Sequence, residues 1–184
     1  LWAVAAWRFG LPTSESHALL AGLSGGALAL GAGAAQLSPG AWLRALAGLA
    51  LSLPAGVAAG RLFRQALRER VRRPAAWQRG AAALTALLHG VQDGQKFMAL
   101  LLLTDGLGGT VPASRLSLAL LTALVMALGT ALGGKPIVEK MGSELASLSP
   151  AEGLAADLGA GAVLIVCSAL GLPVSTTHAK VAAI

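Results

Sequence analysis

The sequence is poor in charged residues. Only 12% of its 184 residues are Asp, Glu, Lys or Arg, whereas 55% are hydrophobic, and the mean hydropathy is +0.72. Soluble domains usually carry about 25% charged residues, so this composition excludes an ordinary soluble globular protein. We expect an all-α membrane protein that crosses the bilayer several times.

Tyrosine is absent, and the sequence has four tryptophans and one cysteine. Aromatic residues therefore give little help in locating the membrane interfaces, which have to be argued from charge. Cys167 lies alone in an apolar run, which excludes an intrachain disulfide and indicates a packing role. The sequence starts at Leu1 without a charged n-region and stops at Ile184, soon after a new apolar segment opens. We expect both ends to be truncated, and no signal peptide is visible.

The positive charge is concentrated in one segment. The formal net charge is +6, and Arg61–Arg79, with seven arginines and one glutamate, accounts for all of it. Arginines beside apolar helices are typical of the cytoplasmic side of a membrane protein, so we expect no nucleic-acid partner. The interpretation predicts a cytoplasmic loop at 61–80 in a plasma-membrane protein. Residues 1–60 and 81–184 would be the membrane-embedded parts on either side.

A polar segment, HGVQDGQK at His89–Lys96, interrupts the apolar run from Ala81 to Leu103. Neither apolar flank alone could cross a bilayer, since about 20 apolar residues are needed, but the whole run is long enough. An ionisable group at mid-membrane carries a high cost. We therefore expect Asp93 and Lys96 to face a cavity, a ligand or one another. A purely structural ion pair between them is the alternative.

A nine-residue motif occurs twice. GLPTSESHA at Gly10–Ala18 recurs as GLPVSTTHA at Gly171–Ala179, with six identical positions. An odd number of crossings between the copies would place them in opposite orientations, as in transporters with inverted repeats and broken helices. A re-entrant hairpin at His89–Lys96 would remove this inversion. Five apolar spans separate the copies: Ala18–Ala35, Ala41–Gly60, Ala81–Leu103, Leu116–Gly134 and Gly153–Leu172.

The repeated motifs place hydroxyl groups where helices are expected to begin. Hydroxyl and backbone N–H donors at helix N-termini suit a phosphate-like anion. Asp93 would repel an anion, but its carboxylate suits a hard cation such as Na⁺. Neighbouring anion and cation sites describe a symporter, because the cation offsets the charge of the anion. The hydroxyls belong to Ser14, Ser16, Ser175, Thr176 and Thr177.

Other interpretations stay open at this stage. The hydroxyls could bond only to their own helices, and His17 and His178 could be capping or packing residues. The anion could be sulfate or another oxyanion. An intramembrane hydrolase could use a serine with His178 or His89 and Asp93, although the serines lack a nucleophile-elbow context. A non-transporting membrane scaffold is the remaining alternative.

HGVQDGQKFMALLLL resembles the second signature of the inorganic phosphate transporter (PiT) family. GLPTSESHALLAG and GLPVSTTHA resemble that family's paired Pro-x-Ser-x-Ser/Thr-His motifs, and GTALGGKPIVEKMG precedes the last span. The resemblance implies cation-coupled uptake of inorganic phosphate by alternating access. It also implies a polytopic protein with two inverted halves, which acts as a transporter rather than an enzyme. The only cofactor would be Na⁺ or H⁺ as the coupling ion, and a homodimer in the lipid bilayer is an open possibility.

The resemblance also implies roles for individual residues. Gln92 and Asp93 fall on the family's Asn-Asp pair, so both become candidates for cation coupling, and Gln92 for substrate binding as well. Lys96 matches the bacterial form of the motif and could contribute positive charge to the anion. The hydroxyl-bearing residues of both motif copies become candidate phosphate ligands. The family's first signature would lie upstream of Leu1. Further candidates are His17, His89, Gln95 and His178.

Overall fold

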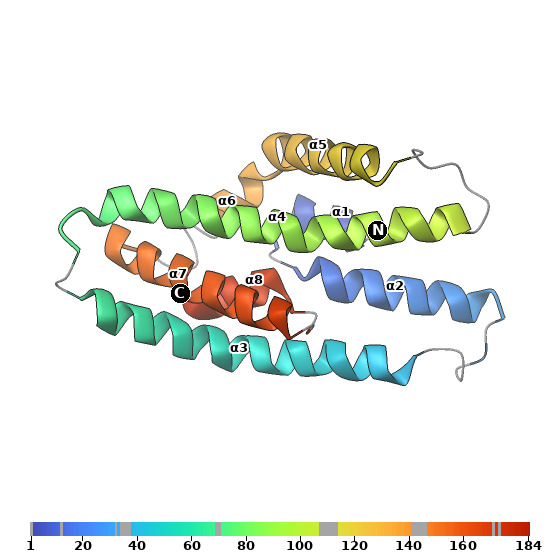
Figure 1. Ribbon diagram of the computed structural model, residues 1–184, viewed down its shortest axis with the longest axis horizontal. Helices are drawn as coiled ribbons and strands as arrows, with labels where there is room; N and C mark the ends of the chain where they lie inside the picture. The colour runs from blue at the N-terminus through green and yellow to red at the C-terminus, as the bar shows by residue number, and fades with distance from the viewer. Residues whose placement is uncertain are drawn as a thin grey trace.

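The computed structural model describes residues 2–11, 13–31, 33, 38–68, 71–106, 114–140, 147–170, 172 and 174–184. The described residues form eight α-helices and no strand, which confirms the all-α fold class. The helices, shown in Figure 1, are α1 (Trp2–Arg8), α2 (Glu15–Ala29), α3 (Pro39–Leu67), α4 (Pro74–Gly106), α5 (Arg115–Gly133), α6 (Lys135–Lys140), α7 (Pro150–Ala169) and α8 (Thr176–Ala183).

Several helices begin at residues that favour a helix start. Ser38 precedes Pro39, and its hydroxyl accepts a hydrogen bond from the Ala41 N–H at 3.3 Å. At α7, Ser149 and Glu152 form a capping box, in which each side chain accepts from the other residue's backbone N–H. Such caps satisfy N–H groups that have no partner within the helix, and proline at the first position removes another.

Helix α7 lies between α3 and α4, and α8 packs against α3 and α7 (Figure 1). Small residues allow this close packing. A Cβ added to Gly56 would lie 2.8 Å from the Ala179 carbonyl oxygen of α8, and one added to Gly159 would lie 2.9 Å from the Gly60 nitrogen. The helices therefore touch backbone to backbone, as small residues permit in membrane bundles.

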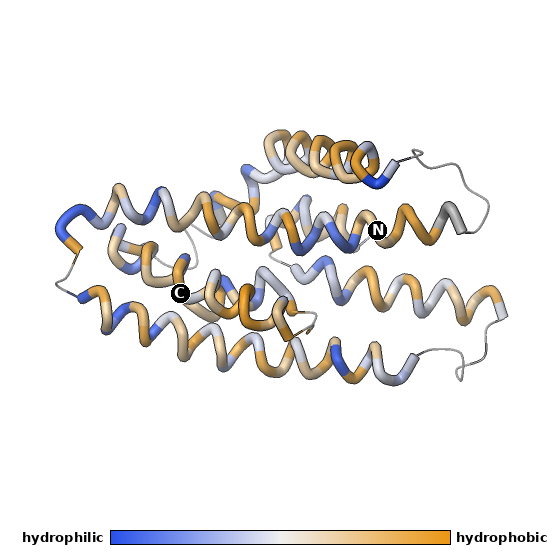
Figure 2. The backbone as a smooth tube through the Cα atoms, viewed as in Figure 1, coloured by the Kyte–Doolittle hydropathy of each residue, from blue (hydrophilic) through white to orange (hydrophobic). Residues whose placement is uncertain are grey.

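The buried core is concentrated along α7. Leu154, Ala160 and Leu164 are almost fully buried, and so is Cys167, which confirms its predicted packing role. By contrast, α5 exposes most of its large apolar side chains, including Leu120 and Leu124. Figure 2 shows that apolar residues dominate the outer helices and that hydrophilic residues gather at the α3–α4 bend and in the middle of α4. An apolar exterior of this kind suits contact with lipid.

Three of the described helices, α3, α5 and α7, are long and apolar enough to cross a membrane. They correspond to three of the five predicted spans. The 15 residues of α2 are fewer than the roughly 20 that a crossing needs, and residues 32, 34 and 35 of that predicted span lie outside the described part. Helix α4 has 33 residues and runs unbroken through His89–Lys96, so the segment is not a re-entrant hairpin. The count of five crossings and the inversion stay predictions.

The predicted loop at Arg61–Arg79 is wrong in its extent. Helix α3 continues to Leu67 and α4 begins at Pro74, so most of this segment is helical. Arginine is a good helix former, and its charged end can reach water while the backbone stays helical. Hydropathy shows where the sequence of a span becomes polar. The helix itself can continue beyond that residue, as α3 does to Leu67. The polar segment at 135–152 likewise contains α6 and the first turn of α7.

Candidate functional site

Four polar side chains of α4 share one face of the helix, because their spacing follows the helical repeat. They are His89, Gln92, Asp93 and Lys96. The Lys96 Nζ lies 2.7 Å from Asp93 Oδ1, and the His89 Nε2 lies 2.9 Å from Asp93 Oδ2. Asp93 is only 7% exposed. Each oxygen of this buried carboxylate therefore has a side-chain nitrogen as its partner. The sequence led us to expect that Asp93 and Lys96 face a cavity, a ligand or one another, and the structure shows them paired with one another.

The first motif copy reaches this cluster through Ser16. The Lys96 ammonium donates a hydrogen bond to the Ser16 hydroxyl at 2.6 Å. Ser14 stands at the N-cap of α2, but its hydroxyl lies 2.5 Å from the His17 Nδ1 and makes no cap hydrogen bond. The first-turn N–H groups of α2 are thus left without the side-chain acceptor that a serine normally supplies there.

The second motif copy reaches the cluster through Thr176, whose Oγ1 lies 3.1 Å from the His89 Nε2. Ser175 caps α8 by accepting from the His178 N–H at 3.1 Å and is 1% exposed. The Thr177 hydroxyl donates to the Thr13 carbonyl at 3.1 Å. Each hydroxyl of this copy therefore has a distinct partner, and among the described hydrogen bonds of these hydroxyls that of Thr176 is the one that reaches α4.

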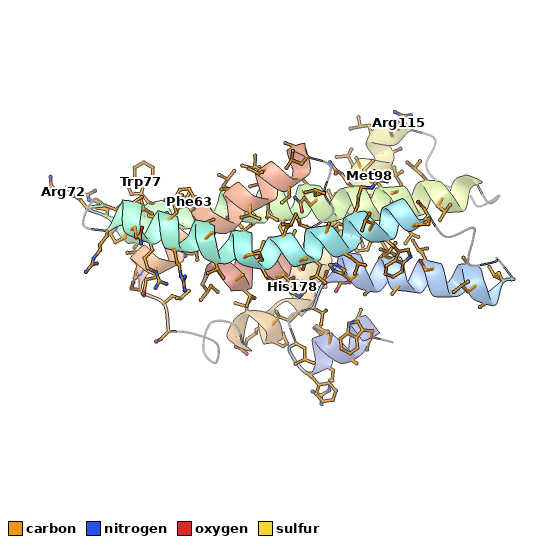
Figure 3. The ribbon with its side chains drawn as sticks, turned by 90° about the horizontal axis from the view of Figure 1, so that it is seen from below. Phe63, Arg72, Trp77, Met98, Arg115 and His178 are labelled. Carbon is orange, nitrogen blue, oxygen red and sulfur yellow. The ribbon has the colours of Figure 1, made fainter. Side chains whose placement is uncertain are left out.

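The two motif copies lie against each other. Besides the bond between Thr177 and Thr13, the rings of His17 and His178 are 6.2 Å apart between centroids. The His17 Nε2 and the His178 Nδ1 are buried without a hydrogen-bond partner in the described part of the chain. Figure 3 marks His178 near the middle of the molecule. The starts of α2 and α8, at Glu15 and Thr176 and so 161 residues apart in sequence, thus meet beside the polar face of α4.

Two cavities adjoin Lys96. A small one of about 120 Å³ is lined by Glu15, Asp93 and Lys96 together with apolar side chains. A larger one of about 380 Å³ is lined by Ser16, His17, Arg44 and Lys96, again with apolar side chains. Two cationic side chains, Arg44 and Lys96, and the Ser16 hydroxyl line the larger cavity together. Such a set of hydrogen-bond donors suits an oxyanion.

The structure does not bring every predicted residue into this cluster. Gln92 turns toward α7, where its Nε2 donates to the Ser168 hydroxyl at 2.5 Å and the Leu164 carbonyl at 3.2 Å. Gln95 is exposed, and its side chain has no hydrogen bond to another described residue. Within the described ranges, no three His, Cys, Asp or Glu side chains are grouped to hold a metal ion.

Sequence reasoning missed two residues of the cavities. Arg44 was not among the predicted candidates, yet it lines the larger cavity, because α3 runs beside α2, where the Trp42 indole N–H donates to the Ser24 hydroxyl. Glu15, which was also not among the predicted candidates, lines the smaller cavity. Its place between Ser14 and Ser16, inside the repeated motif, was the signal that could have identified it.

Comparison with known proteins gives consistent matches. The model of the phosphate transporter family matches residues 62–184. The chain is 36% identical over 203 residues to a probable low-affinity inorganic phosphate transporter of Rhizobium meliloti, covering 100% of this chain and 58% of that protein. A relative of the same description in Bacillus subtilis is 29% identical, covering 96% of this chain and 56% of that protein. The chain thus spans little more than half the length of these relatives. No solved structure matches.

Proposed function

Because the chain belongs to the phosphate transporter family, we propose that the protein carries inorganic phosphate across the plasma membrane together with Na⁺ or H⁺. The family and its curated relatives are transporters, which sets the intramembrane hydrolase aside. The observation that carries the proposal is the position of Lys96. Its ammonium bonds at once to the buried Asp93 and to Ser16 of the first motif copy.

Phosphate would bind in the larger cavity beside Lys96. Arg44 and Lys96 supply positive charge, and Ser16 and the start of α2 supply hydroxyl and N–H donors. Charge-assisted hydrogen bonds are about twice as strong as neutral ones, and helix N-termini favour anions. Phosphate at this position would draw the Lys96 ammonium toward itself and away from Asp93.

This competition for Lys96 provides a route to coupling. A buried carboxylate that loses its ammonium partner is left with uncompensated charge, which costs several kcal/mol. Binding of Na⁺ or a proton at Asp93 would remove that cost. Phosphate therefore binds well only when a cation binds as well, and this is the thermodynamic requirement for symport.

Alternating access would require the contact between the motif copies to open and close. Thr177 and the His17–His178 ring pair link the starts of α2 and α8 directly above the polar face of α4. Separation of α2 from α8 would expose this face to one side of the membrane. Two motif copies in opposite orientations would supply the two alternative openings.

The test is uptake of radiolabelled phosphate into proteoliposomes by the protein from the full-length gene. We expect uptake that depends on a sodium gradient or a proton gradient and that excess sulfate does not suppress. Inhibition by sulfate would identify a different oxyanion as the substrate. No uptake under either gradient, from protein shown to be folded, would contradict the transport proposal and favour the non-transporting scaffold.

A further inference from the structure

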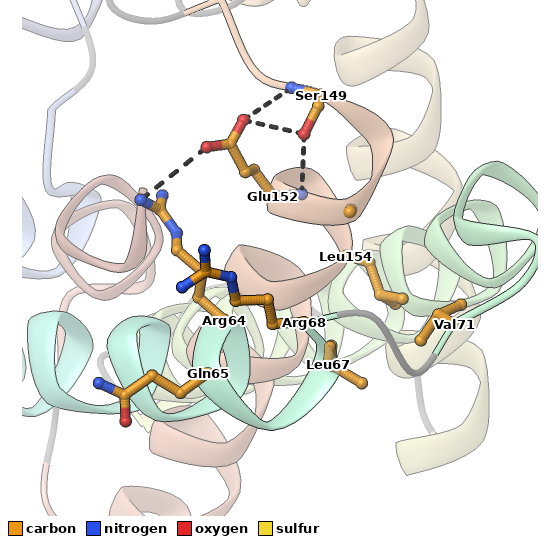
Figure 4. A pocket seen from close by; sticks show the side chains of 9 residues that line it. Arg64, Gln65, Leu67, Arg68, Val71, Ser149, Glu152 and Leu154 are labelled. Carbon is orange, nitrogen blue, oxygen red and sulfur yellow. Dashed lines mark hydrogen bonds and ion pairs between the residues drawn. The ribbon is translucent and has the colours of Figure 1, made fainter.

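A polar cavity lies at the other end of the bundle, where α3 ends and α7 begins (Figure 4). It measures about 480 Å³, and its polar lining includes Arg64, Arg68, Ser149 and Glu152. It shares no lining residue with either of the cavities beside Lys96. The cavity therefore does not belong to the site around Asp93.

The charges in this cavity are not balanced. Arg64 lies 3.9 Å from Glu152 and donates to the Ile184 carbonyl at 3.0 Å. Glu152 is already engaged by the Ser149 backbone N–H and hydroxyl. Arg68, in contrast, has no ion-pair partner among the residues that the structure describes, as Figure 4 illustrates. The cavity thus presents a net positive charge to a ligand.

An apolar cavity of about 740 Å³ adjoins the polar one. Three residues line both cavities: Leu67, Val71 and Leu154. The rest of the apolar cavity lies between α4 and α7. Its lining is mainly apolar and includes Trp77, Leu84 and Leu158. Figure 3 places Trp77, Arg72 and Phe63 at the same end of the molecule. Tryptophan and arginine together are typical of the level of the lipid headgroups.

We propose that these two adjoining cavities bind a membrane phospholipid with an anionic headgroup. The lipid phosphate would bind Arg68 and Arg64, and an acyl chain would lie against Trp77, Leu84 and Leu158. Basic pockets between membrane helices bind anionic headgroups by this chemistry. A free phosphate ion would occupy only the polar cavity and would leave the apolar one unexplained. The adjacency of the two cavities is what selects a lipid.

The test uses the protein from the full-length gene, purified in mild detergent, with bound lipid measured by native mass spectrometry. We expect it to retain dioleoyl phosphatidylglycerol in preference to dioleoyl phosphatidylcholine. Loss of one arginine at a lipid headgroup weakens binding about fivefold, so Arg68→Gln should reduce retention by that factor. The matched control is Arg115→Gln, since Arg115 is exposed at the opposite end in Figure 3.

The apolar cavity is tested separately. Leu84→Trp should fill part of the groove and reduce phosphatidylglycerol retention without changing charge. Should that variant fail to fold, the unmodified protein still answers the question, because retention should fall steeply when dioleoyl is replaced by dibutyryl phosphatidylglycerol. Equal retention by Arg68→Gln and Arg115→Gln would overturn the proposal. So would release of the lipid by excess inorganic phosphate, which would identify a free-anion site instead.

Discussion

Lys96 and Asp93, one turn apart on α4, form an ion pair of 2.7 Å in which the same ammonium also holds Ser16 of α2 at 2.6 Å. Asp93 is buried, whereas the Lys96 side chain keeps 24% of its surface exposed. The carboxylate is thus fixed in the core of the bundle, while the ammonium stands between it and the larger cavity. In the proposed mechanism, Lys96 would sense the anion and Asp93 would respond to it.

Asp93→Asn should abolish cation-dependent phosphate uptake and leave membrane insertion intact. Asparagine keeps the shape of the side chain but removes the charge that a cation would neutralise. Uptake by reconstituted full-length protein measures the effect. Gln95→Ala is the matched control, because Gln95 lies on the same helix but is exposed. Uptake that still follows the ion gradient in Asp93→Asn would remove Asp93 from the coupling mechanism.

Lys96→Gln should raise the KM for phosphate about tenfold or more, because a charge-assisted hydrogen bond to the anion is lost. The initial rate of uptake, measured over a range of phosphate concentrations, gives the KM. Lys135→Gln serves as control, since the Lys135 side chain is 81% exposed and lies outside the cavities. An unchanged KM in Lys96→Gln would show that phosphate binds elsewhere.

Gly159→Ala should destabilise the bundle by about 1–3 kcal/mol, the usual cost of overpacking. The added methyl group would meet the Gly60 backbone of α3 at 2.9 Å. Thermal unfolding of the purified protein should show a lower Tm. Gly129→Ala on α5 is the comparison, because nothing lies within 4 Å of its added methyl group. Equal Tm values for the two variants would mean that α3 and α7 are packed less closely than described.

Lys180→Met should cost about 3 kcal/mol of stability, because it leaves the Asp157 carboxylate buried without a counter-charge. Asp157 is 3% exposed and pairs with Lys180 across α7 and α8. The double variant Asp157→Asn, Lys180→Met should recover most of the loss, as the buried charge is then removed as well. Unfolding curves of the single and double variants measure this recovery. If the loss of stability in the double variant equals the sum of the losses in Asp157→Asn and Lys180→Met, the ion pair does not stabilise the fold.

The centre of the site could be predicted from the sequence because its signals are local. Asp93 and Lys96 stood out as ionisable residues in an apolar run, and the two motif copies stood out as a repeat. The meeting of the copies and the bond between Lys96 and Ser16 were not predictable, since they depend on how α2, α4 and α8 pack.

Three features could not be predicted from the sequence. Gln92 lies beside Asp93 in the chain, but the Ser168 hydroxyl and the Leu164 carbonyl on α7 hold its amide away from the cluster. Arg44 has no local signal at all, because its role depends on the fold-back of α3 along α2. The extent of α3 was missed because hydropathy records the membrane boundary and not the end of the helical hydrogen bonds.

The unbroken course of α4 has a mechanical consequence. Its 33 residues make a rod of about 50 Å, which exceeds the roughly 30 Å of the hydrocarbon layer. Helix α7 packs along part of this rod, where the Thr85 hydroxyl donates to the Asp157 carbonyl and the Gln92 amide donates to the Leu164 carbonyl. Because Leu84 and Lys96 belong to one unbroken helix, a movement of α4 would displace the lining of the cavities at both levels together.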